Sequence, residues 1–132
     1  MSENILQKII DQKKTKIEKL KLEIDINSLL DAISEKNFFF DFKKKIQTNI
    51  SENKISVIAE IKKASPSAGI LIDDYDPVKI ANIYNSKNVT CLSVLTEEDF
   101  FLGNLSHISE IKKKLNYPFF VKIFLLINFK YL

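Results

Sequence analysis

The sequence is poor in the side chains that cross-link chains or bind metals. Its 132 residues include one cysteine, Cys91, and one histidine, His107. A single cysteine excludes a disulfide within the chain and a CxxC metal site. One histidine cannot form a metal-binding cluster by itself. We therefore expect no metal site.

Glycine and long apolar runs are also scarce. The chain has only two glycines, and no GxGxxG follows its first expected strand, which argues against a dinucleotide-binding Rossmann unit. No apolar run reaches membrane-spanning length. Charges interrupt residues 5–20, so the N-terminus lacks the apolar core of a signal peptide. We expect a soluble, cytoplasmic protein with no membrane partner.

Positive charge exceeds negative charge only slightly. The net charge is +3, and much of the excess comes from three lysine clusters, at residues 13–21, 43–45 and 112–114. Such clusters occur on solvated helix faces and in nucleic-acid-binding proteins. We favour solvated helix faces, and we expect no nucleic-acid partner.

What the sequence does contain is enough apolar residues for a core, at 45% of the chain. Apolar residues at helical spacing predict helices over 3–21 and 27–36, the second capped by Asn27 or Ser28. The phenylalanine-rich segment 37–46 is ambiguous, and its rings are expected to cover one end of a core. We expect residues 1–50 to form a helical extension.

From residue 51 onward the pattern changes to alternating strands and helices. Strands are expected at 55–61, at 89–96 and from 117, with helices at 76–88 and 103–116. Their spacing of about 30 residues is typical of βαβ units and a parallel sheet. The predicted fold class is α/β, a partial (β/α)8 TIM barrel over residues 51–132, because three strands cannot close a barrel of eight.

Two helix starts carry recognisable capping residues. Asp76 can cap the first of these helices, and Pro77 suits its first helical position, where the missing N–H costs nothing. The second helix is expected to be capped near Asn104.

The end of the first strand carries two opposite charges. Glu60 and Lys62 are two residues apart, so the strand period places them on one face. If that face points into a barrel, both charges enter one cavity. A neutralising ion pair at the strand end is an equally good interpretation.

The segment after the second strand, 96–103, brings carboxylates and an aromatic pair. Phe100 and Phe101 could wall a flat ligand, but packing beneath the loop is the favoured alternative without other evidence.

The third strand contains Lys122 between apolar neighbours. A lysine inside a buried strand is costly unless it is paired or functional. If Lys62 lies nearby, each ammonium would lower the pKa of the other toward a range useful for a general acid. The alternative is an edge-strand lysine whose ammonium reaches water.

Four segments together resemble the indole-3-glycerol phosphate synthase family, (β/α)8 enzymes of tryptophan biosynthesis. They are "VIAEIKKASPSAG" (57–69), "DPVKIANIY" (76–84), "CLSVLTEEDFFLG" (91–103) and "PFFVK" (118–122). The N-terminal helices are similar to the family's segment before the barrel. The resemblance implies a carboxy-lyase that uses no cofactor and acts on a small phosphorylated substrate, 1-(2-carboxyphenylamino)-1-deoxyribulose 5-phosphate.

The resemblance also implies roles for individual residues. Lys122 matches a general acid of ring closure and dehydration. Lys62 matches a lysine that contacts the anionic substrate and takes part in proton transfer, and Glu60 matches the carboxylate that orients these groups.

The substrate-binding positions follow from the same resemblance. Ser65, Pro66 and Ser67 match the loop near the anthranilate end of the substrate. Phe101 and Phe124 match aromatic positions that wall the anthranilate ring.

After Lys122 the sequence "IFLLINFKYL" departs from the family pattern. The family's later strands, with a second catalytic glutamate and the phosphate-binding loops, are not in this sequence. We therefore expect little activity from this chain alone. Two alternatives are a half-barrel that associates with a separate C-terminal half or with tryptophan-pathway enzymes, and a nonfunctional product of a one-base frameshift near Lys122.

Overall fold

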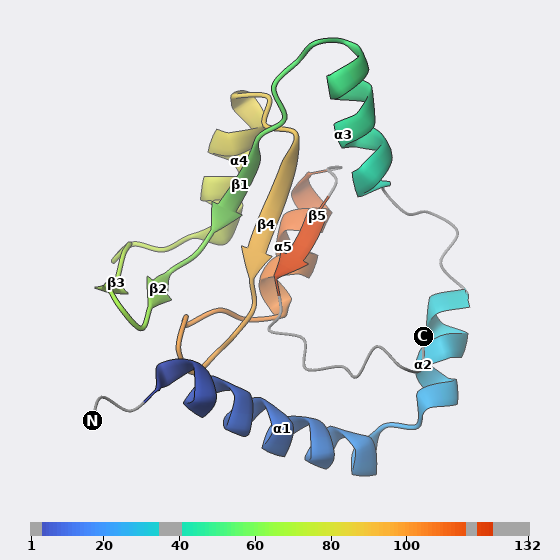
Figure 1. Ribbon diagram of the computed structural model, residues 1–132, viewed down its shortest axis with the longest axis vertical. Coiled ribbons are helices and arrows are strands. Elements are labelled where there is room, and N and C mark those ends of the chain that lie inside the picture. The colour runs from blue at the N-terminus through green and yellow to red at the C-terminus, as the bar shows by residue number, and fades with distance from the viewer. Residues whose placement is uncertain (1–3, 35–40, 116–118, 123–132) are drawn as a thin grey trace. The chain divides into compact units, whose positions relative to one another are not determined.

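A computed structural model of the chain describes residues 4–34, 41–115 and 119–122 (Figure 1). The chain divides into an N-terminal unit that runs to residue 39 and a second unit that covers residues 40–123. The second unit contains the sheet and nearly all of the candidate site residues.

The N-terminal unit contains two helices, α1 (Ile5–Glu23) and α2 (Ile26–Ser34). Asn4 caps α1, because its side-chain oxygen accepts a hydrogen bond from the Leu6 N–H at 3.1 Å. At the start of α2, the Asp25 carboxylate accepts from the Ser28 N–H at 3.2 Å. The helices confirm the two predicted segments, but the expected cap at Asn27 or Ser28 is wrong because α2 already begins at Ile26.

Helix α3 (Phe42–Ser51) resolves part of the ambiguous phenylalanine-rich segment, and its N-cap is Asp41. Near its end, the Asn49 side-chain amide donates to the Thr90 hydroxyl at 3.0 Å and to the Ser56 hydroxyl at 3.1 Å. The Thr90 hydroxyl also accepts from the Val57 N–H at 3.0 Å. These bonds tie α3 to the segments that lead into the first two sheet strands. The extension boundary at residue 50 stays a prediction, and residues 38–40 lie outside the described residues.

The main sheet has three parallel strands in the order β1-β4-β5. They are β1 (Ile58–Ile61), β4 (Cys91–Leu95) and β5 (Phe119–Lys122). All five residues of the middle strand β4 are buried, as expected for the central strand of a parallel sheet. The predicted strand–helix alternation and parallel pairing are therefore confirmed for the described residues.

Two helices, α4 (Pro77–Ser86) and α5 (Ser106–Lys114), pack on one face of this sheet (Figure 1). The shared core consists of strand residues and helix residues in one cluster, among them Ala59, Ile61, Leu92, Val94, Ala81 and Ile111. Strands in sequential order with their helices on one face follow the winding of a (β/α) barrel, whereas a doubly wound sheet reverses strand order and carries helices on both faces.

The predicted cap of α4 is present, whereas the N-cap residue of α5 is Leu105, which forms no side-chain cap bond, and the Asn104 side chain contributes from the position before it. The Asp76 carboxylate accepts from the Val78 N–H at 2.8 Å and the Lys79 N–H at 2.9 Å, with Pro77 in the first turn. The Asn104 side-chain oxygen accepts from the Ser106 N–H at 2.8 Å.

A small antiparallel hairpin follows β1 and was not predicted. Its strands are β2 (Ala64–Ser65) and β3 (Gly69–Ile70). Gly69 has a φ of +65°, a backbone conformation in which glycine is free of the Cβ clash. The Leu71 N–H donates to the Lys63 carbonyl at 2.8 Å and closes the base of the hairpin.

Two aromatic side chains meet at the starts of α4 and α5. The Tyr75 and His107 ring centroids are 5.6 Å apart. The Tyr75 hydroxyl and His107 Nδ1 are buried without a hydrogen-bond partner in the described part of the chain. Burial lowers the pKa of His107 below its usual 6.5, with a further lowering by Lys63 and an opposing effect of Glu110. Burial also raises the pKa of Tyr75 to about 12.

This pair predicts a pH dependence of stability. At pH values between the lowered pKa of His107 in the folded protein and its pKa near 6.5 in the unfolded chain, the unfolded chain binds more protons than the folded protein. The stabilising contribution of neutral His107 is therefore fully present above pH 6.5 and is lost as the pH falls toward the lowered pKa. Thermal unfolding between about pH 5 and pH 7.5 measures the slope. In His107→Phe, which keeps a ring against Tyr75 but cannot titrate, the slope should be shallower. Parallel pH profiles for the two proteins would contradict this expectation.

Candidate active site

The end of β1 carries an ion pair. The Lys62 ammonium lies 3.0 Å from the Glu60 carboxylate, and the two side chains are 29% and 31% exposed. Both alternate with Ala59 and Ile61, which are buried in the core beneath the helices. Glu60 and Lys62 therefore lie on the opposite face of the sheet, as their spacing predicts. The ion pair fits both interpretations of these charges, a catalytic pair and a neutralised strand end.

The strand register puts Lys62 and Lys122 at one level of the sheet. Ile61 pairs with Val94, and Lys122 pairs with Leu95, the next residue of β4. Lys62 follows Ile61 and so reaches the level of Leu95 and Lys122. The backbones of β1 and β5 are two strand spacings apart, about 10 Å. The mutual lowering of the two lysine pKa values stays a prediction.

The Ser-Pro-Ser motif forms the turn of the hairpin that follows β1. The Ser65 hydroxyl accepts from the Ala68 N–H at 3.2 Å and lies 3.4 Å from the Ser67 hydroxyl. Pro66 and Ser67 are exposed, and Ser65 is half-buried. The motif is thus presented to solvent by a turn that is closed by its own side chains.

The loop after β4 is built around one buried carboxylate. Glu97 is 1% exposed, and its carboxylate accepts from the Asp99, Phe100 and Phe101 N–H groups at 3.2, 2.7 and 3.2 Å. The Glu97 carbonyl accepts from the Gly103 N–H at 2.7 Å. Both phenylalanines are half-buried, so they have surface left for contact with a ligand.

The two loops are joined by their backbones. The Ala64 N–H, in the first strand of the hairpin, donates to the Phe101 carbonyl at 3.2 Å. This bond brings the Ser-Pro-Ser turn and Phe101, predicted separately from the sequence, into one region beyond the end of β1. Phe124 lies outside the described residues.

Sequence reasoning missed the part that Glu97 plays in this loop. The available signal was a glutamate two residues after a fully buried strand and three residues before an aromatic pair. A carboxylate at such a position can accept several backbone N–H bonds from the loop that follows it.

Leu102, next to this loop's aromatic pair, has a φ of +52°. This left-handed conformation brings Cβ close to a carbonyl oxygen and costs a residue other than glycine roughly 1–2 kcal/mol. Asparagine tolerates it better, and the chain itself places Asn53 and Asn88 at φ values of 54° and 55°.

We therefore expect Leu102→Asn to stabilise the protein by about 0.5–1 kcal/mol. Leu102→Ala keeps the Cβ and should give no such gain. Urea unfolding of the three proteins measures the difference. Equal stabilities of the asparagine and alanine variants would show that backbone strain at residue 102 is not the cause.

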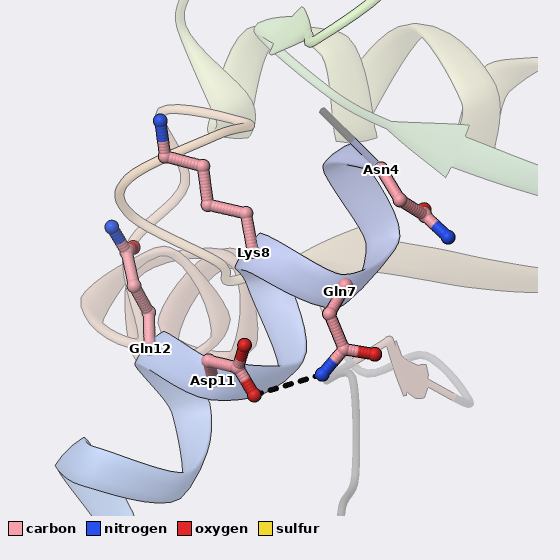
Figure 2. A pocket seen from close by; sticks show the side chains of 5 residues that line it. All are labelled: Asn4, Gln7, Lys8, Asp11 and Gln12. Atoms are coloured by element: carbon pink, nitrogen blue, oxygen red, sulfur yellow. Dashed lines mark hydrogen bonds between the residues drawn. The ribbon is translucent and has the colours of Figure 1, made fainter. Parts of the chain in front are cut away.

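An open depression lies on the N-terminal turns of α1 (Figure 2). It is lined by Asn4, Gln7, Lys8, Asp11 and Gln12, with the Gln7 side chain donating to Asp11 at 2.9 Å. None of the predicted site residues contributes to it.

Within the described ranges, the structure has no cluster of three histidine, cysteine or acidic side chains that could hold a metal, and none of the helices in those ranges is long and apolar enough to span a membrane.

Comparison with known proteins gives one consistent result. A model of the family "Indole-3-glycerol phosphate synthase" matches residues 6–130. Proteins of that name from Desulforamulus reducens, Alkaliphilus metalliredigens and Campylobacter fetus are 40%, 38% and 36% identical to the chain. Each alignment covers 92% of this chain but only 45–46% of the relative.

The chain therefore spans about half the length of these curated relatives. The match covers both units and includes the ion pair, the hairpin and the Glu97 loop. The chain belongs to the indole-3-glycerol phosphate synthase family.

Proposed function

We propose that the chain carries the first part of an indole-3-glycerol phosphate synthase active site. Such an enzyme is a carbon–carbon lyase of tryptophan biosynthesis. Its reaction closes a pyrrole ring on 1-(2-carboxyphenylamino)-1-deoxyribulose 5-phosphate and releases carbon dioxide and water. The observation that carries the proposal is the half-buried Glu60–Lys62 ion pair at 3.0 Å. It lies at the carboxyl end of a parallel strand, where (β/α) barrels place their chemistry.

The three charged residues have separate roles in this proposal. Lys122 acts as general acid, giving a proton to the substrate carbonyl oxygen during ring closure and assisting the later loss of water. Lys62 binds the anionic substrate and takes part in proton transfer. Glu60 holds the Lys62 ammonium in place, which its 3.0 Å contact supports, and positioning of this kind is a large part of catalysis.

The aromatic end of the substrate would lie against the two joined loops. Ser65, Pro66 and Ser67 are proposed to line its edge, while Phe101 and Phe124 cover its ring. The half-buried state of Phe101 supports this role, because a flat ring can still stack on its remaining surface.

The proposed fold is a TIM barrel of eight strands, and the described residues include three parallel strands that would belong to it. A second candidate function is that of a half-barrel that associates with a separate C-terminal half. The exposed edge of β1 favours it. Among the described residues, β1 pairs only with β4, and Val57 and Ile58 are 46% and 49% exposed. Apolar residues beside an unpaired strand edge favour addition of another strand.

We expect the purified chain alone to give little or no turnover of this substrate. Co-expression with the C-terminal half of the Desulforamulus reducens relative should restore formation of indole-3-glycerol phosphate, which chromatography of the reaction mixture detects. Robust turnover by the chain alone would refute the expectation. Failure of any combination, together with no cooperative unfolding, would favour a nonfunctional product.

A further inference from the structure

Glu97 connects two segments that the proposed function assigns to the substrate. Its carboxylate accepts three backbone N–H bonds from the loop after β4, and one of these comes from Phe101. The same Phe101 residue accepts, through its carbonyl, the Ala64 N–H of the hairpin. The connection therefore runs from a buried carboxylate through Phe101 to the strand that bears Ser65.

The hydrogen bonds to the Glu97 carboxylate are the strongest part of this connection. Hydrogen bonds to an ionised acceptor are roughly twice as strong as neutral ones. Glu97 is 1% exposed, so water does not compete well for its carboxylate. Its carbonyl also accepts from the Gly103 N–H at 2.7 Å, which fixes the far end of the loop. The hairpin is tied to a loop that has little freedom to move.

We propose that Glu97 is a positioning residue for the aromatic-binding part of the site. It holds Phe101 and, through the Ala64–Phe101 bond, the Ser-Pro-Ser turn at a fixed separation. The assignment of a substrate to this region rests on the proposed function. The positioning itself is a property of the fold and is tested separately.

Amide hydrogen exchange of the full chain, measured by NMR, tests the positioning. In Glu97→Ala the Phe101 amide should exchange at least about tenfold faster, because it loses its acceptor. The Ala64 amide should follow it, although nothing near Ala64 has been replaced. The control is Glu98→Ala, which removes the same charge from the exposed neighbouring residue and should change neither amide.

Glu97→Gln keeps the test valid if the alanine variant does not fold. A glutamine has one oxygen where glutamate has two. Asp99 donates to one carboxylate oxygen, whereas Phe100 and Phe101 share the other. If the glutamine oxygen accepts from the two phenylalanine N–H groups, the Phe101 and Ala64 amides should stay protected from exchange. The Asp99 amide should then exchange faster, because it has lost its acceptor. Faster exchange at Phe101 with an unchanged rate at Ala64, in a folded variant, would overturn the proposal.

Binding of anthranilate, as a probe of the aromatic end, separates this role from the proposed function. Titration by NMR should show affinity weakened about fivefold or more by Glu97→Ala, restored in part by Glu97→Gln and unchanged by Glu98→Ala. Weakening by Glu98→Ala to the same extent would count against a specific role for Glu97. No binding to the unmodified chain would overturn the proposed function, and the exchange pattern alone would then decide the positioning role.

Discussion

Replacing Gly103 by alanine is expected to lower the free energy of unfolding by about 2–3 kcal/mol, the upper part of the range for overpacked sites. An added Cβ would overlap the Leu95 carbonyl oxygen and lie 2.9 Å from the carbonyl carbons of Leu95 and Thr96. These are backbone atoms at the end of a buried strand, so they cannot rotate away. The Gly103 N–H is also held by the Glu97 carbonyl at 2.7 Å, which limits any retreat of the loop.

The chain's other glycine provides a matched control. A Cβ at Gly69 meets no described atom within 4 Å, but the residue has a φ of +65°. Gly69→Ala should therefore cost only the backbone strain, about 1 kcal/mol. Urea unfolding of the three proteins, with the m-value compared in each, measures both costs. A larger loss for Gly69→Ala than for Gly103→Ala would contradict the steric argument.

The regular elements were predictable because their signals are local. The strand around Ile61 and the strand around Val94 are short apolar runs, and the helix after Asp76 has both a capping carboxylate and a proline in its first turn. Buried strands alternating with amphipathic helices leave few arrangements other than a parallel sheet. The shared face of Glu60 and Lys62 followed from the strand period alone.

The loops were not predictable in the same way, because long-range hydrogen bonds shape them. The hairpin at Ala64 is joined to Phe101, and α3 is joined to the sheet through Asn49 and Thr90. No periodicity in the sequence shows such pairs. The buried position of Glu97 was equally hidden, since a glutamate is usually exposed unless its charge is compensated. The catalytic assignment of Glu60, Lys62 and Lys122 also came from resemblance and not from pattern.

If Lys62 has the role proposed for it, Lys62→Met should produce a large loss of activity. The substitution keeps most of the side-chain length but removes the ammonium that lies 3.0 Å from Glu60. Loss of a group that binds an anionic substrate and transfers a proton typically lowers the rate about 10²–10⁴-fold. The suitable protein is a chimera in which residues 1–122 replace the matching part of the Desulforamulus reducens relative, and kcat for indole-3-glycerol phosphate formation is the measurement.

Stability separates this role from that of a neutralised strand end. A partly exposed ion pair contributes about 0–1 kcal/mol, so Lys62→Met should leave the melting temperature nearly unchanged while kcat collapses. Lys63→Met is the matched control, because the adjacent lysine lies in the bend after β1 and acts electrostatically on His107, and it should retain activity. Glu60→Gln should reduce kcat less than Lys62→Met, since the ammonium remains but loses its charged neighbour. A lower melting temperature with unchanged kcat in Lys62→Met would favour the purely structural ion pair.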